Sequence, residues 1–125
     1  MSEKITALVT GASRGIGAAI AHQLTEDGYF VVGTATSQDG AQAIDERLGD
    51  HGVGIRLDVA DSDSVASVAG LIGEKTSMPL IVVNNAGVTK DNLLMRMSDA
   101  EWNEVIETNL SGAFRVTKPM LRGML

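Results

Sequence analysis

Short apolar runs alternate with stretches whose apolar residues recur every three or four positions along this chain of 125 residues. Runs of the first kind are typical of buried strands, and the second spacing is typical of amphipathic helices. We expect four strands, at about Ile5–Val9, Tyr29–Thr34, Gly54–Leu57 and Leu80–Val83. Strands that alternate with helices indicate parallel β-α units, so the predicted fold class is α/β with a doubly wound parallel sheet.

The apolar stripes of three helices are expected to pack on this sheet. Their members are Ile16, Ile20 and Leu24 in the first helix, Ala41, Ile44 and Leu48 in the second, and Val65, Val68, Ala69 and Ile72 in the third. The third helix should begin at Asp61-Ser62-Asp63, because short side-chain oxygens can accept hydrogen bonds from the free backbone N–H groups of a first turn.

A fourth, longer helix is predicted to open with Ser98-Asp99-Ala100-Glu101, a capping-box pattern in which serine and glutamate satisfy each other's backbone donors. One face of this helix then carries Trp102, Ile106, Asn109, Ala113, Val116 and Met120. Pro119 lacks a backbone N–H, so we expect it to bend or end the helix nearby.

Charge and composition exclude several classes of function. The net charge of −6 and the pI near 4.7 argue against general binding to nucleic acids or anionic membranes. The chain has no cysteine for disulfides or thiolate chemistry, and His22 and His51 have no partner at metal-ligand spacing, so no metal site is predicted. No long apolar segment follows a basic start, so we expect no secretion signal or membrane span and a cytoplasmic location.

The candidate chemistry begins in the segment Thr10–Gly17, which follows the first predicted strand and reads Thr-Gly-Ala-Ser-Arg-Gly-Ile-Gly. A strand, a glycine-rich turn and a helix that begins near Gly15 would direct free backbone N–H groups and the positive end of the helix dipole at an anion. Glycine is needed because a side chain would hold a phosphate away from the backbone. The glycine spacing differs from G-x-G-x-x-G, so a tight turn without a ligand is the alternative.

Three further motifs fall where a parallel sheet places its ligands, at the carboxyl ends of the strands. Asp58-Val59 follows the third strand, Asn84-Asn85-Ala86-Gly87 follows the fourth, and Asn109 lies in the last helix although asparagine is a poor helix former. In this order, and together with the glycine turn, these motifs resemble the short-chain dehydrogenase/reductase family across essentially the whole chain. The resemblance implies a Rossmann-type sheet that binds a nicotinamide coenzyme.

The resemblance also assigns coenzyme-binding residues. In the glycine turn these are Gly11, Ala12, Ser13, Arg14, Gly15, Ile16 and Gly17, which would line the diphosphate and ribose. Asp58 would accept a hydrogen bond from the adenine amino group, Val59 would pack on the adenine ring, and Asn85, Ala86 and Gly87 would border the nicotinamide ribose. On the residues alone, Asp58 could equally be a turn aspartate, and the asparagine pair could be a turn that supports the central strand.

The choice of coenzyme follows from charge. Sites for NAD usually place an acid about twenty residues beyond the glycines, where it binds the ribose 2′-hydroxyl, whereas NADP sites place a cation there. The end of the second strand reads Gly33-Thr34-Ala35-Thr36-Ser37, so hydroxyls, with Thr36 among them, replace the carboxylate. Arg14 is then free to pair with a 2′-phosphate, and NADPH/NADP is the predicted coenzyme; an exposed loop arginine is the alternative for Arg14.

The family resemblance implies a catalytic set of tyrosine, lysine, serine and asparagine. Of these only Asn109 is matched here, with the implied role of holding the helix locally open to a relay water; a buried asparagine satisfied by backbone groups is the alternative. The single tyrosine, Tyr29, is followed by Phe30-Val31-Val32-Gly33, so the Tyr-x-x-x-Lys pair that protonates the carbonyl oxygen is absent. We interpret Tyr29 as a packing residue at the end of the sheet opposite the coenzyme.

Within the family, three segments resemble the bacterial ketoreductases of fatty-acid elongation, which use NADPH to reduce 3-oxoacyl groups linked to acyl-carrier protein: Gly11–Gly17, Gly33–Ser37 and Asn84–Met97. We therefore expect residues 1–125 to form the NADP-binding half-domain of such an enzyme, without its C-terminal catalytic and substrate portion. Leu80–Val83 would then be an exposed apolar edge, and the last helix would help form a homo-oligomer through Trp102, Phe114 and Met120. The alternatives are a short-chain reductase of another small ketone or sugar, and a non-catalytic nucleotide-binding or association module.

Overall fold

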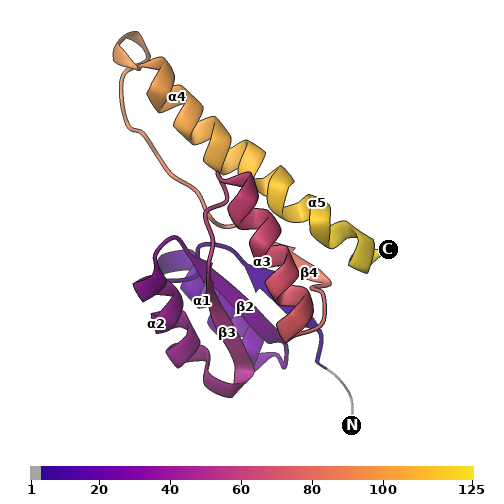
Figure 1. Cartoon of the computed structure of the whole chain (residues 1–125). Coiled ribbons are helices and arrows are strands. Elements are labelled where there is room, and N and C mark those ends of the chain that lie inside the picture. Colours follow the sequence, from indigo (N-terminus) through magenta and orange to yellow (C-terminus); the bar gives the residue numbers. More distant parts are fainter. Residues whose placement is uncertain (1–3) are drawn as a thin grey trace.

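A parallel four-stranded sheet with helices on both faces forms the body of the protein. The computed structural model describes residues 4–125 (Figure 1). The strands are β1 (Thr6–Val9), β2 (Phe30–Ala35), β3 (Gly52–Arg56) and β4 (Ile81–Val83), all parallel and in the order β3-β2-β1-β4. The helices are α1 (Gly15–Glu26), α2 (Gln38–Leu48), α3 (Ser62–Lys75), α4 (Asp99–Val105) and α5 (Gly112–Met124). The predicted α/β class with a doubly wound sheet is confirmed.

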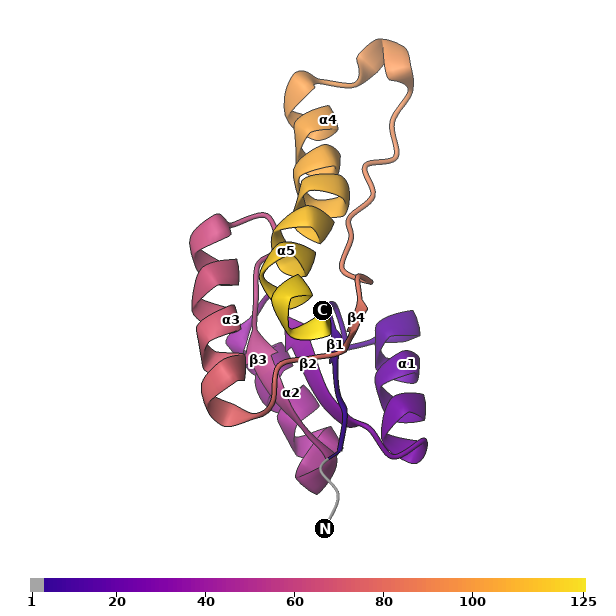
Figure 2. The same ribbon diagram turned by 90° about the vertical axis from the view of Figure 1, so that its right-hand side faces the viewer.

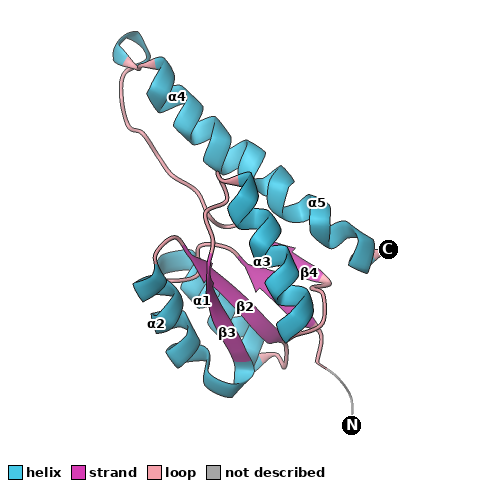
Figure 3. Ribbon diagram, viewed as in Figure 1, coloured by secondary structure: helices cyan, strands magenta, loops and turns pink. Residues whose placement is uncertain are grey.

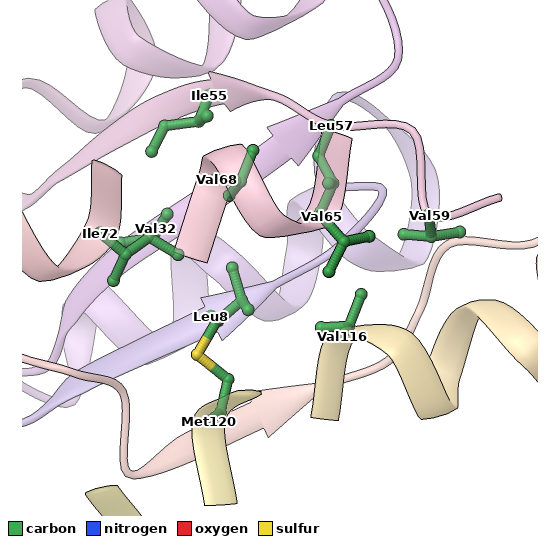
Figure 4. Packing of buried hydrophobic residues seen from close by; sticks show 10 residues of the cluster. All are labelled: Leu8, Val32, Ile55, Leu57, Val59, Val65, Val68, Ile72, Val116 and Met120. Atoms are coloured by element: carbon green, nitrogen blue, oxygen red, sulfur yellow. The ribbon is translucent and has the colours of Figure 1, made fainter. Parts of the chain in front are cut away.

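Neighbouring residues of the central strands point to opposite faces of the sheet and so build two separate cores. Leu8 belongs to the core under α3 and α5, whereas Val9 belongs to the core under α1 and α2. Val32 and Val31 divide between the same two cores. Figure 2 shows α3 and α1 on opposite sides of the sheet, and Figure 4 shows Leu8 among the side chains that α3 and α5 supply. Both faces of β1 and β2 are therefore buried, which explains their continuous apolar sequences.

The predicted strands are all present, with boundaries that shift by one or two residues. The prediction was wrong at Ile16, which was expected to pack on the sheet but is 74% exposed. Gly17 and Ala21 are the buried residues of α1, with Ile20 and Leu24 packed beside them. Ile16 lies in the first turn of α1, where the helix has just left the edge of the sheet, so its side chain has no strand beneath it.

The last predicted helix begins as expected. The Ser98 side chain accepts a hydrogen bond from the Glu101 N–H, and the Glu101 carboxylate accepts one from the Ser98 N–H, which completes the capping box. The Ser98 N–H, followed by the Asn92 side-chain amide, lowers the pKa of Glu101 below its ordinary value. The helix then passes through a π-helical segment, Ile106–Ser111, into α5.

Pro119 does not end this helix, because α5 continues to Met124. Val116 and Met120 lie on either side of the proline and are both buried against the sheet. Their packing outweighs the cost of a proline inside a helix, which is about 3 kcal/mol and combines a lost backbone hydrogen bond with a clash of the ring against the preceding turn. The expectation that Met120 faces a partner is also wrong, since only 1% of it is exposed; Trp102 and Phe114 are 56% and 64% exposed.

One edge of the sheet is formed by β4, as predicted for Leu80–Val83. A long connection leaves β4 and runs beside the α4–α5 rod, so that the start of α4 projects away from the sheet (Figures 1 and 3). Leu94 and Met95, at the tip of this connection, are 80% and 94% exposed. Within residues 4–125 no helix is long and apolar enough to cross a membrane.

Burial of the α3 stripe can be tested with two neighbouring residues. Ile72 is fully buried in the core between α3, α5 and the sheet, whereas Leu71 is 37% exposed. Replacing Ile72 with alanine should lower the free energy of unfolding by about 2–5 kcal/mol, and Leu71→Ala should cost less than about 1 kcal/mol. Urea denaturation of the two variants measures the difference. Equal losses would show that α3 does not pack as described.

Candidate functional site

A cavity of about 670 Å³ opens at the carboxyl ends of the strands. Its walls come from the turns after β1, β2, β3 and β4 and from α4 and the π-helical segment. The lining residues are Gly11, Ser13, Arg14, Gly15, Ile16, Ala35, Thr36, Leu57, Asp58, Val59, Ala60, Asn85, Ala86, Gly87, Val88, Glu104 and Thr108. Since parallel strands all end at this edge, motifs far apart in the sequence meet around one space.

The turn after β1 borders this cavity and leads into α1 through a run of backbone N–H donors. Gly11 and Gly15 have φ angles of 63° and 60°, in the left-handed region that favours glycine. Within residues 4–125, no hydrogen bond joins the backbone N–H groups of residues 13–17 to a protein acceptor. Arg14 is the N-cap of α1 in extended conformation, and its side chain does not cap the helix. These donors and the positive end of the α1 dipole make this turn suited to an anion.

Hydrogen bonds to the turn after β4 hold the glycine turn in place. The Thr10 hydroxyl accepts hydrogen bonds from the N–H groups of Asn85 and Ala86 at 3.1 and 3.0 Å. The Asn85 side-chain amide donates to the Gly11 carbonyl at 3.0 Å. A Cβ on Gly17 would lie 2.0 Å from the Gly11 carbonyl oxygen and 2.5 Å from Asn85 Nδ2, so only glycine fits there.

The end of β2 forms the neighbouring wall. The Ala12 N–H donates to the Thr34 carbonyl at 2.8 Å, and the Gly11 N–H donates to the Thr34 hydroxyl at 3.3 Å. Thr36 lines the cavity beyond them. Residues 33–37 contain no acidic side chain, so this wall offers hydroxyl and backbone groups where a carboxylate would repel a phosphate.

Asp58 satisfies a structural role and still faces the cavity. Its Oδ1 accepts a hydrogen bond from the Ala60 N–H at 3.0 Å, and its own N–H donates to the Ser64 hydroxyl at 3.1 Å. Asp58 is therefore a turn aspartate, the alternative that the residues alone left open, and it also lines the cavity together with Val59.

Asn109 pairs with the backbone of the β4–α4 connection. Its Oδ1 accepts the Val88 N–H at 2.8 Å, and its Nδ2 donates to the Val88 carbonyl at 2.9 Å. The alternative to a relay role was a buried asparagine whose side chain is satisfied by backbone groups. The hydrogen bonds agree with that alternative, but Asn109 is exposed and lies in the π-helical segment. An ion pair of 3.2 Å between Lys90 and Glu104 joins the same connection to α4.

The structure brings most of the predicted coenzyme-binding residues together around the cavity. Three predicted residues do not line it: Ala12 and Gly17 are buried beneath the turn, and Asn109 lies behind Val88. The prediction missed Ala35, Leu57, Ala60, Val88, Glu104 and Thr108. Ala35 and Leu57 adjoin the predicted strand ends and could have been inferred from them. Glu104 and Thr108 come from a helix whose position over the sheet has no local sequence signal.

No group of three or more His, Asp or Glu side chains within residues 4–125 could hold a metal ion. His22 lies 3.6 Å from Glu26 on the exposed side of α1, and His51 is exposed in a short helical turn.

The close approach at Gly17 generates a prediction with an internal control. Gly17→Ala places a methyl group against the Gly11 carbonyl and should lower the free energy of unfolding by at least about 1–3 kcal/mol. Gly70, inside α3, has open space where a Cβ would lie, so Gly70→Ala should be neutral or stabilise by up to about 1 kcal/mol. Thermal unfolding distinguishes the two variants. Equal behaviour would mean that Gly17 does not lie against the Gly11 carbonyl and the Asn85 side chain as described.

Comparison with known proteins agrees with this geometry. The short chain dehydrogenase family model matches residues 5–125. The chain is 55% identical over 119 residues to the 3-oxoacyl-[acyl-carrier-protein] reductase FabG of Vibrio harveyi and 56% identical over 119 residues to that of Escherichia coli, covering 95% of this chain and 49% of each relative. The FabG of Pseudomonas aeruginosa is 54% identical over 121 residues. The chain spans about half the length of these curated relatives, and it belongs to the short-chain dehydrogenase family.

Proposed function

We propose that this chain binds NADPH in the cavity and supplies the coenzyme-binding half of a 3-oxoacyl-[acyl-carrier-protein] reductase. The observation that carries the proposal is the row of N–H groups of residues 13–17, which have no protein acceptor within residues 4–125 and lie where α1 begins. A diphosphate supplies acceptor oxygens to several adjacent N–H groups at once, and its charge is favoured by the helix dipole.

The remaining walls fit the other parts of a dinucleotide. The volume of about 670 Å³ lies in the range of small-molecule sites. The Asp58 carboxylate uses Oδ1 in its turn, which leaves Oδ2 to accept from an adenine amino group, with Val59 beside it. At the opposite end, Asn85, Ala86 and Gly87 would border the nicotinamide ribose, and Asn109 fixes the adjoining Val88 backbone.

The preference for NADPH over NADH rests on charge at the β2 end of the cavity. Arg14 lines the cavity together with Thr36, and no acid occurs within residues 33–37 to bind a ribose 2′-hydroxyl. No ion pair within residues 4–125 involves Arg14. Its guanidinium can therefore form a charge-assisted contact with a 2′-phosphate.

The acyl-carrier-protein-linked substrate is inferred from the names of the relatives. A bound NADPH would supply a hydride to a carbonyl carbon, but the 125 residues contain no Tyr-x-x-x-Lys pair to protonate the carbonyl oxygen. Tyr29 does not substitute for it. It directly precedes β2, at the amino ends of the strands, whereas the cavity lies at their carboxyl ends, and its N–H donates to the Leu24 carbonyl. We therefore expect this chain to bind the coenzyme without turning over substrate.

Assembly with further copies is part of the proposal. Trp102 and Phe114, which were expected to face a partner, are exposed on α4 and α5. Lys118 lies 5.6 Å from the centre of the Phe114 ring, so this face combines an aromatic surface with a positive charge.

Coenzyme preference tests the role of Arg14. Replacing Arg14 with alanine should weaken NADPH binding by about tenfold or more, because a hydrogen bond to a charged group contributes about 1.5–3 kcal/mol, and should change NADH binding by less than about threefold. Titration calorimetry with both coenzymes measures the two affinities. Arg122→Ala, on the exposed side of α5, removes the same charge away from the cavity and serves as the control. Unchanged NADPH preference in Arg14→Ala would remove this assignment.

Turnover tests the missing proton donor. Purified chain of verified intact mass should bind NADPH yet show no oxidation of it above background in the presence of an acetoacetyl thioester, as followed by absorbance. Oxidation of NADPH by this chain alone would contradict the argument from the absent tyrosine and lysine. Failure to bind NADPH or NADH at all would favour an association module instead.

A further inference from the structure

Arg56, the last residue of β3, reaches the same wall of the cavity from outside. It pairs with Ala35 in the sheet register, and its Nε–H donates to the Thr36 carbonyl at 3.1 Å. Thr36 lines the cavity, whereas Arg56 does not. The guanidinium is therefore anchored to the backbone of a residue that lines the cavity, at the point where β2 leads into α2.

The alternation of β3 fixes the side from which Arg56 approaches. Ile55 and Leu57 belong to the core under α3 and α5, so Arg56, between them, projects toward the face that α1 and α2 cover. Ser37, the N-cap of α2, follows Thr36 directly. Arg56 is thus held beside the positive end of the α2 dipole, where anions are favoured and a cation would otherwise be disfavoured.

The outer part of the Arg56 guanidinium is not neutralised by an acid. Within residues 4–125, Arg56 takes part in no ion pair, and Nε is its one hydrogen-bonding atom. The nearby acids do not pair with it: Asp58 turns its Oδ1 to the Ala60 N–H, and Asp39, in the first turn of α2, forms no ion pair within residues 4–125. Its two terminal amino groups keep the planar fork that suits phosphate oxygens.

We infer that Arg56 is a second arginine for the 2′-phosphate of NADPH and acts across Thr36 from Arg14. The inference rests on the proposed function and adds a residue outside the glycine turn to the determinants of coenzyme choice. Anchoring through Nε lowers the entropy lost when the two terminal amino groups bind. A protein of net charge −6 then holds an anion between two local cations.

The test separates recognition of the 2′-phosphate from simple support of the Thr36 backbone. The variants are Arg56→Met and Arg56→Lys, with Arg122→Met as the matched control for loss of one exposed arginine. The probes are NADPH, NADH, 2′,5′-ADP and 5′-AMP, titrated by calorimetry. We expect Arg56→Met to weaken binding of NADPH and 2′,5′-ADP by about tenfold or more, while binding of NADH and 5′-AMP changes by less than about threefold. Arg56→Lys should fall between the wild type and Arg56→Met, because it keeps the charge but loses the fork and the Nε anchor.

The outcomes distinguish the two proposals. Equal weakening of the probes with and without a 2′-phosphate in Arg56→Met would mean that Arg56 only supports the Thr36 backbone, and would overturn the inference while leaving the proposed function intact. No effect in Arg56→Met, or the same effect in Arg122→Met, would also overturn it. Failure of the wild-type protein to bind any of the four probes would overturn the proposed function and the inference together. Circular dichroism of each variant verifies that the fold is retained.

Discussion

The candidate site depends on the contact between the turns that follow β1 and β4. Asn85 donates its side-chain amide to the Gly11 carbonyl, and the Thr10 hydroxyl accepts from the backbone of Asn85 and Ala86. Gly17 can pass beneath Gly11 only because it has no Cβ. These contacts provide partners within the protein for the Thr10 hydroxyl and the Gly11 carbonyl. The N–H groups of residues 13–17 have no acceptor within residues 4–125, and it is this asymmetry that makes the turn suitable for an anion.

The charged groups around the cavity differ in their balance from the chain as a whole. A net charge of −6 repels a dinucleotide at long range, so binding must come from groups in contact with it. The cavity contains two carboxylates, Asp58 and Glu104. Lys90 forms an ion pair with Glu104 at 3.2 Å, and one oxygen of Asp58 accepts a hydrogen bond from the Ala60 N–H. Both contacts reduce the negative potential that these carboxylates produce in the cavity. Arg14 and Arg56 take part in no ion pair within residues 4–125.

The architecture could be predicted from the sequence because both faces of the inner strands are buried, and their continuous apolar runs report that directly. Parallel strands also place the residues after each strand at one edge, which is why Thr36, Asp58 and Asn85 could be assigned to one site before the fold was described. The glycine turn was predicted as a whole, but its pattern could not separate residues that face the cavity from Ala12 and Gly17, which lie beneath it. That distinction depends on how the turn packs on its neighbours.

Other features depend on contacts between distant segments and left no local signal. Helical periodicity placed Ile16 on the sheet, yet the strand ends before the first turn of α1 reaches it. Pro119 was expected to bend or end the helix nearby, yet the helix does not end there: α5 continues to Met124, with Val116 and Met120 buried on either side of the proline. Glu104 and Thr108 reach the cavity because the α4–α5 rod crosses its end, which only the packing of α5 on the sheet determines. Asn109 was singled out as unusual in a helix, and its pairing with Val88 explains why it is there.

The most direct test of this account follows the backbone amides themselves. In a ¹⁵N-labelled sample titrated with NADPH, the account predicts saturable chemical-shift changes that are largest at the N–H groups of residues 13–17, with smaller changes at Thr36 and Asp58. Saturable binding whose largest changes fall elsewhere, with the amides of residues 13–17 unaffected, would contradict it.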